Sequence, residues 1–214
     1  MKLSFPSLRS AVAVAGLALS SLLAADKAVF EQDFTQVPPG ELPAEFMVLD
    51  GQFTVKEEAG NRFIELPGAP LDSFGVLFGN NAADGLELTA RIHGTRSGRK
   101  FPTFAIGLNG VGGYKVRVSP AKGVVELVHG DDIKASAPFK WTSGEWARLK
   151  LAVKRQGEGV RITAKAWQGD TEPADWNLTA DEAVKLPAGK AGVWGLPFSG
   201  TALRFDDLRI AAVP

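Results

Sequence analysis

Alternation of apolar and polar residues is the feature that most constrains the fold of this chain. The segment LELTARIH, residues 86–93, carries Leu, Leu, Ala and Ile at one set of alternate positions and Glu, Thr, Arg and His at the other. Successive side chains of a β-strand point to opposite faces, so this pattern predicts a strand with one buried face. The same pattern recurs in segments 103–110, 113–119, 146–155 and 159–167.

Clusters of Gly, Pro, Asn and Asp separate these segments and predict turns. Many short strands with one polar face favour an all-β fold, an antiparallel two-sheet β-sandwich. A parallel sheet would require unbroken apolar strands joined by crossover helices, and the chain lacks this pattern. Residues 179–186, TADEAVKL, are the one segment that predicts a helix, of one or two turns.

The first 25 residues are typical of a secretory signal peptide. Lys2 and Arg9 precede an uncharged apolar run over residues 11–23, and small residues follow before Asp26. The run is shorter than the roughly 20 residues that a membrane span needs. We therefore expect a single domain over residues 26–214 that is secreted or periplasmic and has no membrane span once the signal is removed.

Composition excludes several classes of function. The chain has no cysteine, which rules out disulfides, thiolate metal sites and a cysteine nucleophile. Lys2 and Arg9 belong to the predicted leader, so that 22 of the 24 basic residues remain against 24 acidic residues. A net charge near −2 gives no reason to expect a nucleic-acid partner.

Four segments carry a resemblance to a known family. They are VFEQDF (29–34), KAWQGDTEPADWN (165–177), AGKAGVWG (188–195) and LRFDDLRI (203–210). This series resembles the concanavalin A-like lectin/glucanase superfamily, in particular the laminin G-like and 3-keto-disaccharide hydrolase-like jelly rolls of bacterial secreted proteins. The resemblance implies a concanavalin A-like jelly roll, a fold that serves lectins, hydrolases, lyases and adhesion modules.

Trp167 is the first candidate for a binding residue. It falls in register with Arg161, Thr163 and Lys165, so alternation predicts that it points away from the core. A flat ring beside polar groups would suit the C–H face of a sugar. In the alternative interpretation, Trp167 covers its own hairpin and stacks on Pro173. Trp194 is expected in the core.

The carboxylates argue against a laminarinase-type active site. Such enzymes place a nucleophile and an acid/base about 5 Å apart on one strand, in a Glu-x-Asp-x-x-Glu or Glu-x-Asp-x-Glu run. Neither run occurs here, and Glu87 and Glu126 are solitary outward residues. A catalytic pair would have to assemble from separate strands, for example from Glu87 and Glu126, whereas solvated surface charges are the simpler interpretation.

A polysaccharide lyase is the second enzymatic alternative. Arg91 and His93 share an outward face, and Tyr114 and Lys115 lie on a later strand. Some jelly-roll lyases use His and Tyr to remove a proton beside a uronate while Arg neutralises its carboxylate. Alternation, however, places Tyr114 on the inward face. A set of cationic residues also favours an acidic glycan, unless it forms an ordinary solvated surface: Arg91, Arg96, Arg99, Lys100, Lys115 and Arg117.

The resemblance further implies one structural calcium ion where the first and last strands meet. The matching acidic residues are Asp33 and Asp206. For the whole chain we predict a module that binds a polysaccharide or oligosaccharide, or a cell surface, through a concave sheet. The predicted contacts are Trp167, Arg91, His93, Lys115 and Arg117. A hydrolase or lyase using Glu87, Glu126 or His93, and a structural module without ligand, are the alternatives; the oligomeric state stays open.

Overall fold

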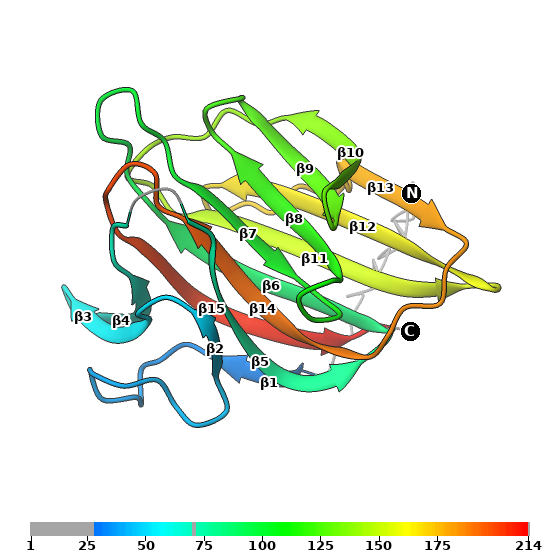
Figure 1. The fold of residues 1–214 in the computed structure, drawn as a ribbon, viewed down its shortest axis with the longest axis horizontal. Helices are drawn as coiled ribbons and strands as arrows, with labels where there is room; N and C mark the ends of the chain where they lie inside the picture. Colours follow the sequence, from blue (N-terminus) through cyan, green and yellow to red (C-terminus); the bar gives the residue numbers. More distant parts are fainter. Residues whose placement is uncertain (1–27, 70–71, 214) are drawn as a thin grey trace, which may run out of the picture.

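Two antiparallel sheets stacked face to face make up the computed structural model, which describes residues 28–69 and 72–213 (Figure 1). The predicted signal peptide lies outside the described residues. No helix occurs within residues 28–69 and 72–213. The predicted all-β, antiparallel two-sheet sandwich is confirmed.

The eight-stranded sheet has the order β13-β12-β11-β6-β15-β4-β3, with β1 paired to β15 as well. Its strands are β1 (Ala28–Gln32), β3 (Thr54–Glu58), β4 (Asn61–Leu66), β6 (Leu86–His93), β11 (Ala147–Gln156), β12 (Gly159–Gln168), β13 (Leu178–Glu182) and β15 (Leu203–Ala212).

The seven-stranded sheet has the order β10-β9-β8-β7-β14-β5-β2. Its strands are β2 (Met47–Asp50), β5 (Phe74–Ala82), β7 (Thr103–Gly107), β8 (Tyr114–Ser119), β9 (Val124–His129), β10 (Asp132–Pro138) and β14 (Gly189–Leu196).

The core lies between the sheets and follows the alternation in the sequence. Leu88 and Ile92 of β6 and Ile162 of β12 are fully buried, as are Ile106 and Val116 on the opposing sheet. The side chains at the alternate positions, such as Thr89 and Arg91 of β6, point outward and are more polar. Each sheet therefore presents one outer face on which a ligand site can form.

The predicted helix over residues 179–186 is wrong. Leu178–Glu182 forms the edge strand β13, which pairs with β12. Leu178 is buried in the core, and Asp181 forms an ion pair across the strands with Arg161. Pairing with a sheet edge therefore outweighs a local preference for a helical turn.

Strand β15 changes its neighbour halfway along its length. Leu203 to Phe205 pair with β4, whereas Leu208 to Ala211 pair with β1. The register shifts between Asp206 and Arg209, and Asp207 has a positive φ of 49°. This bulge turns the fully buried carboxylate of Asp206 toward Arg91 on β6.

No described residue belongs to a helix with the length and apolar character of a membrane span.

Candidate functional site

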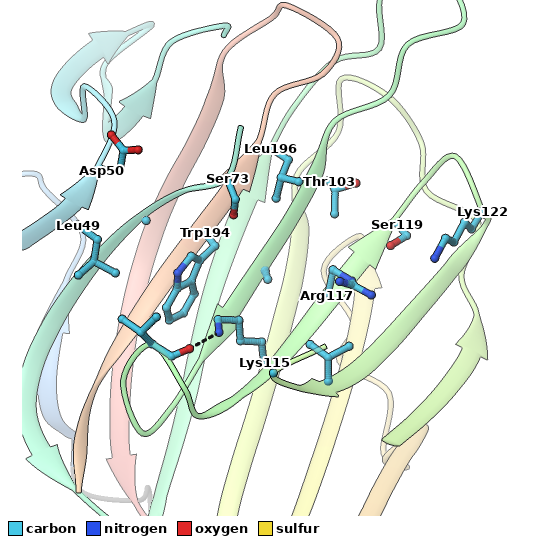
Figure 2. A pocket seen from close by; sticks show the side chains of 15 residues that line it. Leu49, Asp50, Ser73, Thr103, Lys115, Arg117, Ser119, Lys122, Trp194 and Leu196 are labelled. Carbon is cyan, nitrogen blue, oxygen red and sulfur yellow. Dashed lines mark hydrogen bonds between the residues drawn. The ribbon is translucent and has the colours of Figure 1, made fainter. Parts of the chain in front are cut away.

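A hollow of about 630 Å³ lies on the outer face of the seven-stranded sheet, and we call it the front hollow (Figure 2). Its lining comes from strands β2, β5, β7, β8, β9 and β14 and from the loop between β7 and β8. The hollow thus rests on a continuous hydrogen-bonded sheet, a rigid support for a binding site.

Trp194 of β14 lies on the floor of the front hollow. Its indole rests where a side chain at Gly75, Gly107 or Gly192 would collide with it, since a Cβ there would come within 2.6 to 2.8 Å of ring atoms. Trp194 is buried, as predicted, but it packs in a small cluster with Leu77 and Ala105 and not in the main core between the sheets. Val193 is buried between the sheets, so alternation along the strand places Trp194 on the outer face.

Lys115 of β8 lies over this ring. Its Nζ is 4.6 Å from the Trp194 ring centroid and donates a hydrogen bond to the carbonyl of Val111 at 2.6 Å. Figure 2 shows the lysine and the indole lying against each other at one side of the hollow. The pKa of Lys115 is lowered mainly by burial and, to a smaller extent, by the nearby positive charge of Arg117.

A polar network lies farther along the hollow. Arg117 of β8 donates to Glu126 of β9 through Nε at 3.0 Å and Nη2 at 2.8 Å, and Ser119 Oγ donates to the same carboxylate oxygen at 3.1 Å. Lys122 approaches the other oxygen at 3.5 Å. Burial alone would raise the pKa of Glu126, but these partners hold it below its usual value.

The remaining lining is apolar and hydroxylic. Leu49 and Val111 are 41% and 57% exposed and lie at the margin of the hollow, whereas Trp194 beneath Lys115 is 7% exposed. The hydroxyls of Ser73 and Thr103 also line it, and they form no hydrogen bond within residues 28–69 and 72–213. Because Lys115 covers the indole, apolar contact with a ligand is offered mainly by Leu49 and Val111.

A second hollow of about 370 Å³ lies on the outer face of the eight-stranded sheet, and we call it the rear hollow. Here Lys150 is held between Glu87 at 3.3 Å and Glu172 at 2.7 Å, and Lys165 pairs with Glu172 at 2.8 Å. Trp167 lines this hollow but is only 6% exposed. The ring points away from the core, as alternation predicted, yet it offers little exposed surface for a sugar.

The five predicted contact residues do not share one surface. Trp167, Arg91 and His93 belong to the eight-stranded sheet, whereas Lys115 and Arg117 belong to the seven-stranded sheet. Outer faces of stacked sheets point in opposite directions, with a core about 10 Å thick between them. The prediction of a single concave surface carrying all five is therefore wrong.

Arg91 and His93 have local partners. Arg91 Nη2 donates to Asp206 at 2.6 Å, and its guanidinium lies 4.6 Å from the centroid of Trp146. His93 Nε2 donates to the carbonyl of Gly144 at 3.1 Å, and its ring lies 5.4 Å from that of Trp146. Burial lowers the pKa of His93. Both side chains contribute to packing of the eight-stranded sheet.

The enzymatic constellations predicted from sequence do not assemble. Glu87 lies on the eight-stranded sheet and Glu126 on the seven-stranded sheet, so they cannot form a catalytic pair. His93 and Lys115 face opposite sides of the sandwich, and Tyr114 is buried between the sheets. The groups of the lyase alternative therefore lie in three different layers.

The acidic residues that the resemblance assigns to calcium do not fit that ion. Asp206 is fully buried and accepts hydrogen bonds from Arg91, Asn61 and the backbone N–H of Asp207. Asp33 instead lines the rear hollow and binds Thr35. No group of three or more acidic or histidine side chains that suits a metal occurs within the described part of the chain.

Comparisons with known proteins identify the fold only. No family model matches this sequence, and no curated protein matches it. Among solved structures, the carbohydrate-binding module CBM66 from Bacillus subtilis is 13% identical with a TM-score of 0.54, and the alignment covers 78% of this chain and 96% of that one. The Emp47p carbohydrate recognition domain is 8% identical with a TM-score of 0.60, covering 91% and 100%.

An enzyme is also among the similar structures. The catalytic domain of the glycoside hydrolase family 131 protein from Coprinopsis cinerea is 11% identical with a TM-score of 0.53, covering 88% of this chain and 95% of that domain. The chain therefore has a concanavalin A-like jelly-roll fold, as the sequence resemblance implied. Because binding modules and hydrolases share this fold, function has to be argued from the site.

Proposed function

We propose that this protein is an exported glycan-binding module that holds a polysaccharide or oligosaccharide in the front hollow. The observation that carries the proposal is the lining of that hollow. Exposed Leu49 and Val111, the hydroxyls of Ser73 and Thr103, which form no hydrogen bond to any described residue, and the ammonium of Lys115 lie around one open surface. Apolar patches with a few polar groups at their margin suit sugars, whose C–H faces are apolar and whose rims carry hydroxyls.

Binding is favoured over hydrolysis by the shortage of carboxylates in the front hollow. A retaining or inverting glycosidase needs two carboxyl groups on either side of the scissile bond. Among the described residues, Asp50 is the one acidic residue that lines the hollow. Glu126 is engaged by Arg117, Ser119 and Lys122, which hold its pKa low and disfavour a role as general acid.

Export is supported by residues 1–25, whose charged start and apolar run are those of a secretory signal. A secreted or periplasmic location would expose the module to glycans outside the cytoplasm. Sequencing the N-terminus of the protein recovered from an expressing bacterial cell tests this part of the proposal, and an intact Met1 in the recovered protein would contradict it.

A glycan array followed by calorimetry tests the proposed site. We expect the protein to bind at least one saccharide, and Val111→Asp to weaken that binding, because a carboxylate there would compete for Lys115. Val29→Asp is the matched control, since Val29 is an equally exposed valine on β1 of the other sheet. Equal loss in both variants, or loss in neither, would contradict a site in the front hollow.

The same saccharides test the enzymatic alternative. Incubation with the protein should release no reducing ends and no unsaturated sugars. Product formation that disappears in Asp50→Asn would replace the binding proposal with a hydrolase or lyase acting in the front hollow.

A further inference from the structure

The front hollow carries more positive charge than its acidic residues neutralise. Lys115, Arg117 and Lys122 line it, and among the described residues Glu126 is the carboxylate that pairs with two of them, Arg117 and Lys122. Asp50 lines the hollow without an ion pair to any of the three, and its carboxylate accepts a hydrogen bond from the backbone of Gly51. The cationic side of the hollow is therefore left with uncompensated charge.

Lys115 carries the positive charge that remains uncompensated. An ammonium has three N–H donors, and the Val111 carbonyl takes one of them. No carboxylate forms an ion pair with Lys115 within residues 28–69 and 72–213. Its other contacts are the face of Trp194 and the neighbouring charge of Arg117, which repels it. Two donors thus remain available to a ligand.

Two lysines with little exposure, Lys150 in the lining of the rear hollow and Lys165 beside it, both have carboxylate partners. Lys150 is held by two carboxylates, and Lys165 by Glu172 and the carbonyl of Pro173. Charges removed from water are ordinarily paired, because desolvation of an unpaired charge is costly. Lys115 departs from this pattern, because within the described residues its ammonium contacts a carbonyl and an indole face but no carboxylate.

We propose that the saccharide taken by the front hollow is acidic, with a uronate carboxylate bound by Lys115 beside Arg117. This inference rests on the proposed function of the hollow. The C–H face of the same sugar or its neighbour would lie against Leu49 and Val111, and sugar hydroxyls would reach Thr103 and Ser73. A carboxylate satisfies the two remaining donors of Lys115 and neutralises the charge that Glu126 leaves uncompensated.

Paired probes test the inference. Oligosaccharides of homogalacturonan, alginate and hyaluronan are each compared by calorimetry with their carboxyl-reduced counterparts, in which CH₂OH replaces the carboxylate. We expect at least one acidic member to bind, and to bind about tenfold more tightly than its neutral counterpart, as a charge-assisted hydrogen bond predicts. Lys115→Gln should abolish this preference, and Lys115→Arg should retain most of it.

Lys154→Gln is the control variant, because Lys154 is an exposed residue of β11 on the opposite sheet. Thermal unfolding of all three variants shows whether they fold like the parent, and the preference for acid over neutral probe is independent of small changes in stability.

Failure of this inference and failure of the proposed function give different results. Neutral probes that bind as tightly as acidic ones, or a preference for acid that survives Lys115→Gln, would overturn the acidic ligand while leaving the hollow a glycan site. Binding of neutral saccharides on the array, with none of the three acidic probes bound, would also overturn it. A protein that binds no saccharide on the array would overturn both.

Discussion

The front and rear hollows lie on opposite outer faces of one sandwich, and they use charge differently. At the rear hollow the charges of Lys150 and Lys165 are neutralised by Glu87 and Glu172, and Trp167 is buried. In the front hollow Lys115 has no carboxylate partner among the residues that the structure describes, and Val111 is exposed. The contrast teaches that charged and aromatic residues on a sheet identify a binding surface only when their interactions are left incomplete.

Loss of Arg91 is expected to have the largest effect on stability. Asp206 is fully buried and the Arg91 side chain is 21% exposed, so Arg91→Ala would leave a buried carboxylate without its cation. We expect a cost of about 3 kcal/mol in the free energy of unfolding, measured with urea. Saccharide binding by the folded protein should not change, because this ion pair belongs to the eight-stranded sheet.

Arg161→Ala is the control for that experiment. Arg161 also pairs with an aspartate, Asp181, but both side chains are exposed at the sheet edge. The midpoint of unfolding should scarcely move. A comparable loss in both variants would mean that burial does not distinguish the two ion pairs.

Gly75→Ala should disturb the floor of the front hollow. The new Cβ would lie 2.6 Å from Trp194 Nε1. The indole cannot move toward the sheet, because it already lies against Gly107 and Gly192. The ring would be pushed toward Lys115. We expect a stability loss of about 2 kcal/mol and weaker saccharide binding, measured by urea unfolding and calorimetry.

Gly112→Ala is the matched control, because a Cβ at Gly112 meets nothing within 4 Å and the backbone there does not need a positive φ. Unchanged affinity in Gly75→Ala would show that the position of Trp194 does not matter to the ligand.

Acid should weaken the polar network of the front hollow. The pKa of Glu126 is lower in the folded protein than in the unfolded chain, so its stabilising contribution is complete above the unfolded value and is lost as the pH falls through the folded value. Glu126→Gln should cost about 1 to 2 kcal/mol at neutral pH, because the neutral amide replaces charge-assisted hydrogen bonds.

Urea unfolding of parent and Glu126→Gln across the acidic range measures this contribution. The difference between the two proteins should shrink with decreasing pH. A constant difference would show that ionisation of Glu126 does not stabilise the fold.

Lys122→Ala should have the smallest effect. Its side chain is 62% exposed and 3.5 Å from Glu126, so salt and water screen its charge. We expect less than about a threefold loss in affinity for an acidic saccharide, and the loss should vanish at high salt. A loss in affinity as large as that of Lys115→Gln would mean that Lys122, and not Lys115, is the main contact for the anion.

Alternation predicted the positions of several residues correctly. Leu88, Ile162 and Tyr114 are buried as expected, because a strand sends successive side chains to opposite faces wherever it lies in the sheet. The same rule applied to GVWGL would have placed Trp194 opposite Val193 and so on an outer face. The expectation of a core tryptophan relied on residue type instead; it predicted the burial of Trp194 but not the sheet face on which the ring lies.

Sequence patterns did not predict which residues contact each other in the fold. TADEAVKL carries helix signals, yet residues 178–182 pair with β12. Asp206, which the resemblance assigns to calcium, accepts hydrogen bonds from Arg91 and Asn61, which are 115 and 145 residues away along the chain. Such contacts depend on which strands become neighbours, and local periodicity does not specify the order of the strands.

By itself, the sequence determined an antiparallel sandwich and the set of side chains that leave its interior, since both follow from the two-residue period of an extended backbone. Only the tertiary structure decided which sheet each strand joined. That assignment placed Arg91 and Lys115 on opposite faces and laid Trp194 over glycines of three strands. Strand pairing joins residues distant in the chain, and it is this pairing that assembles a site.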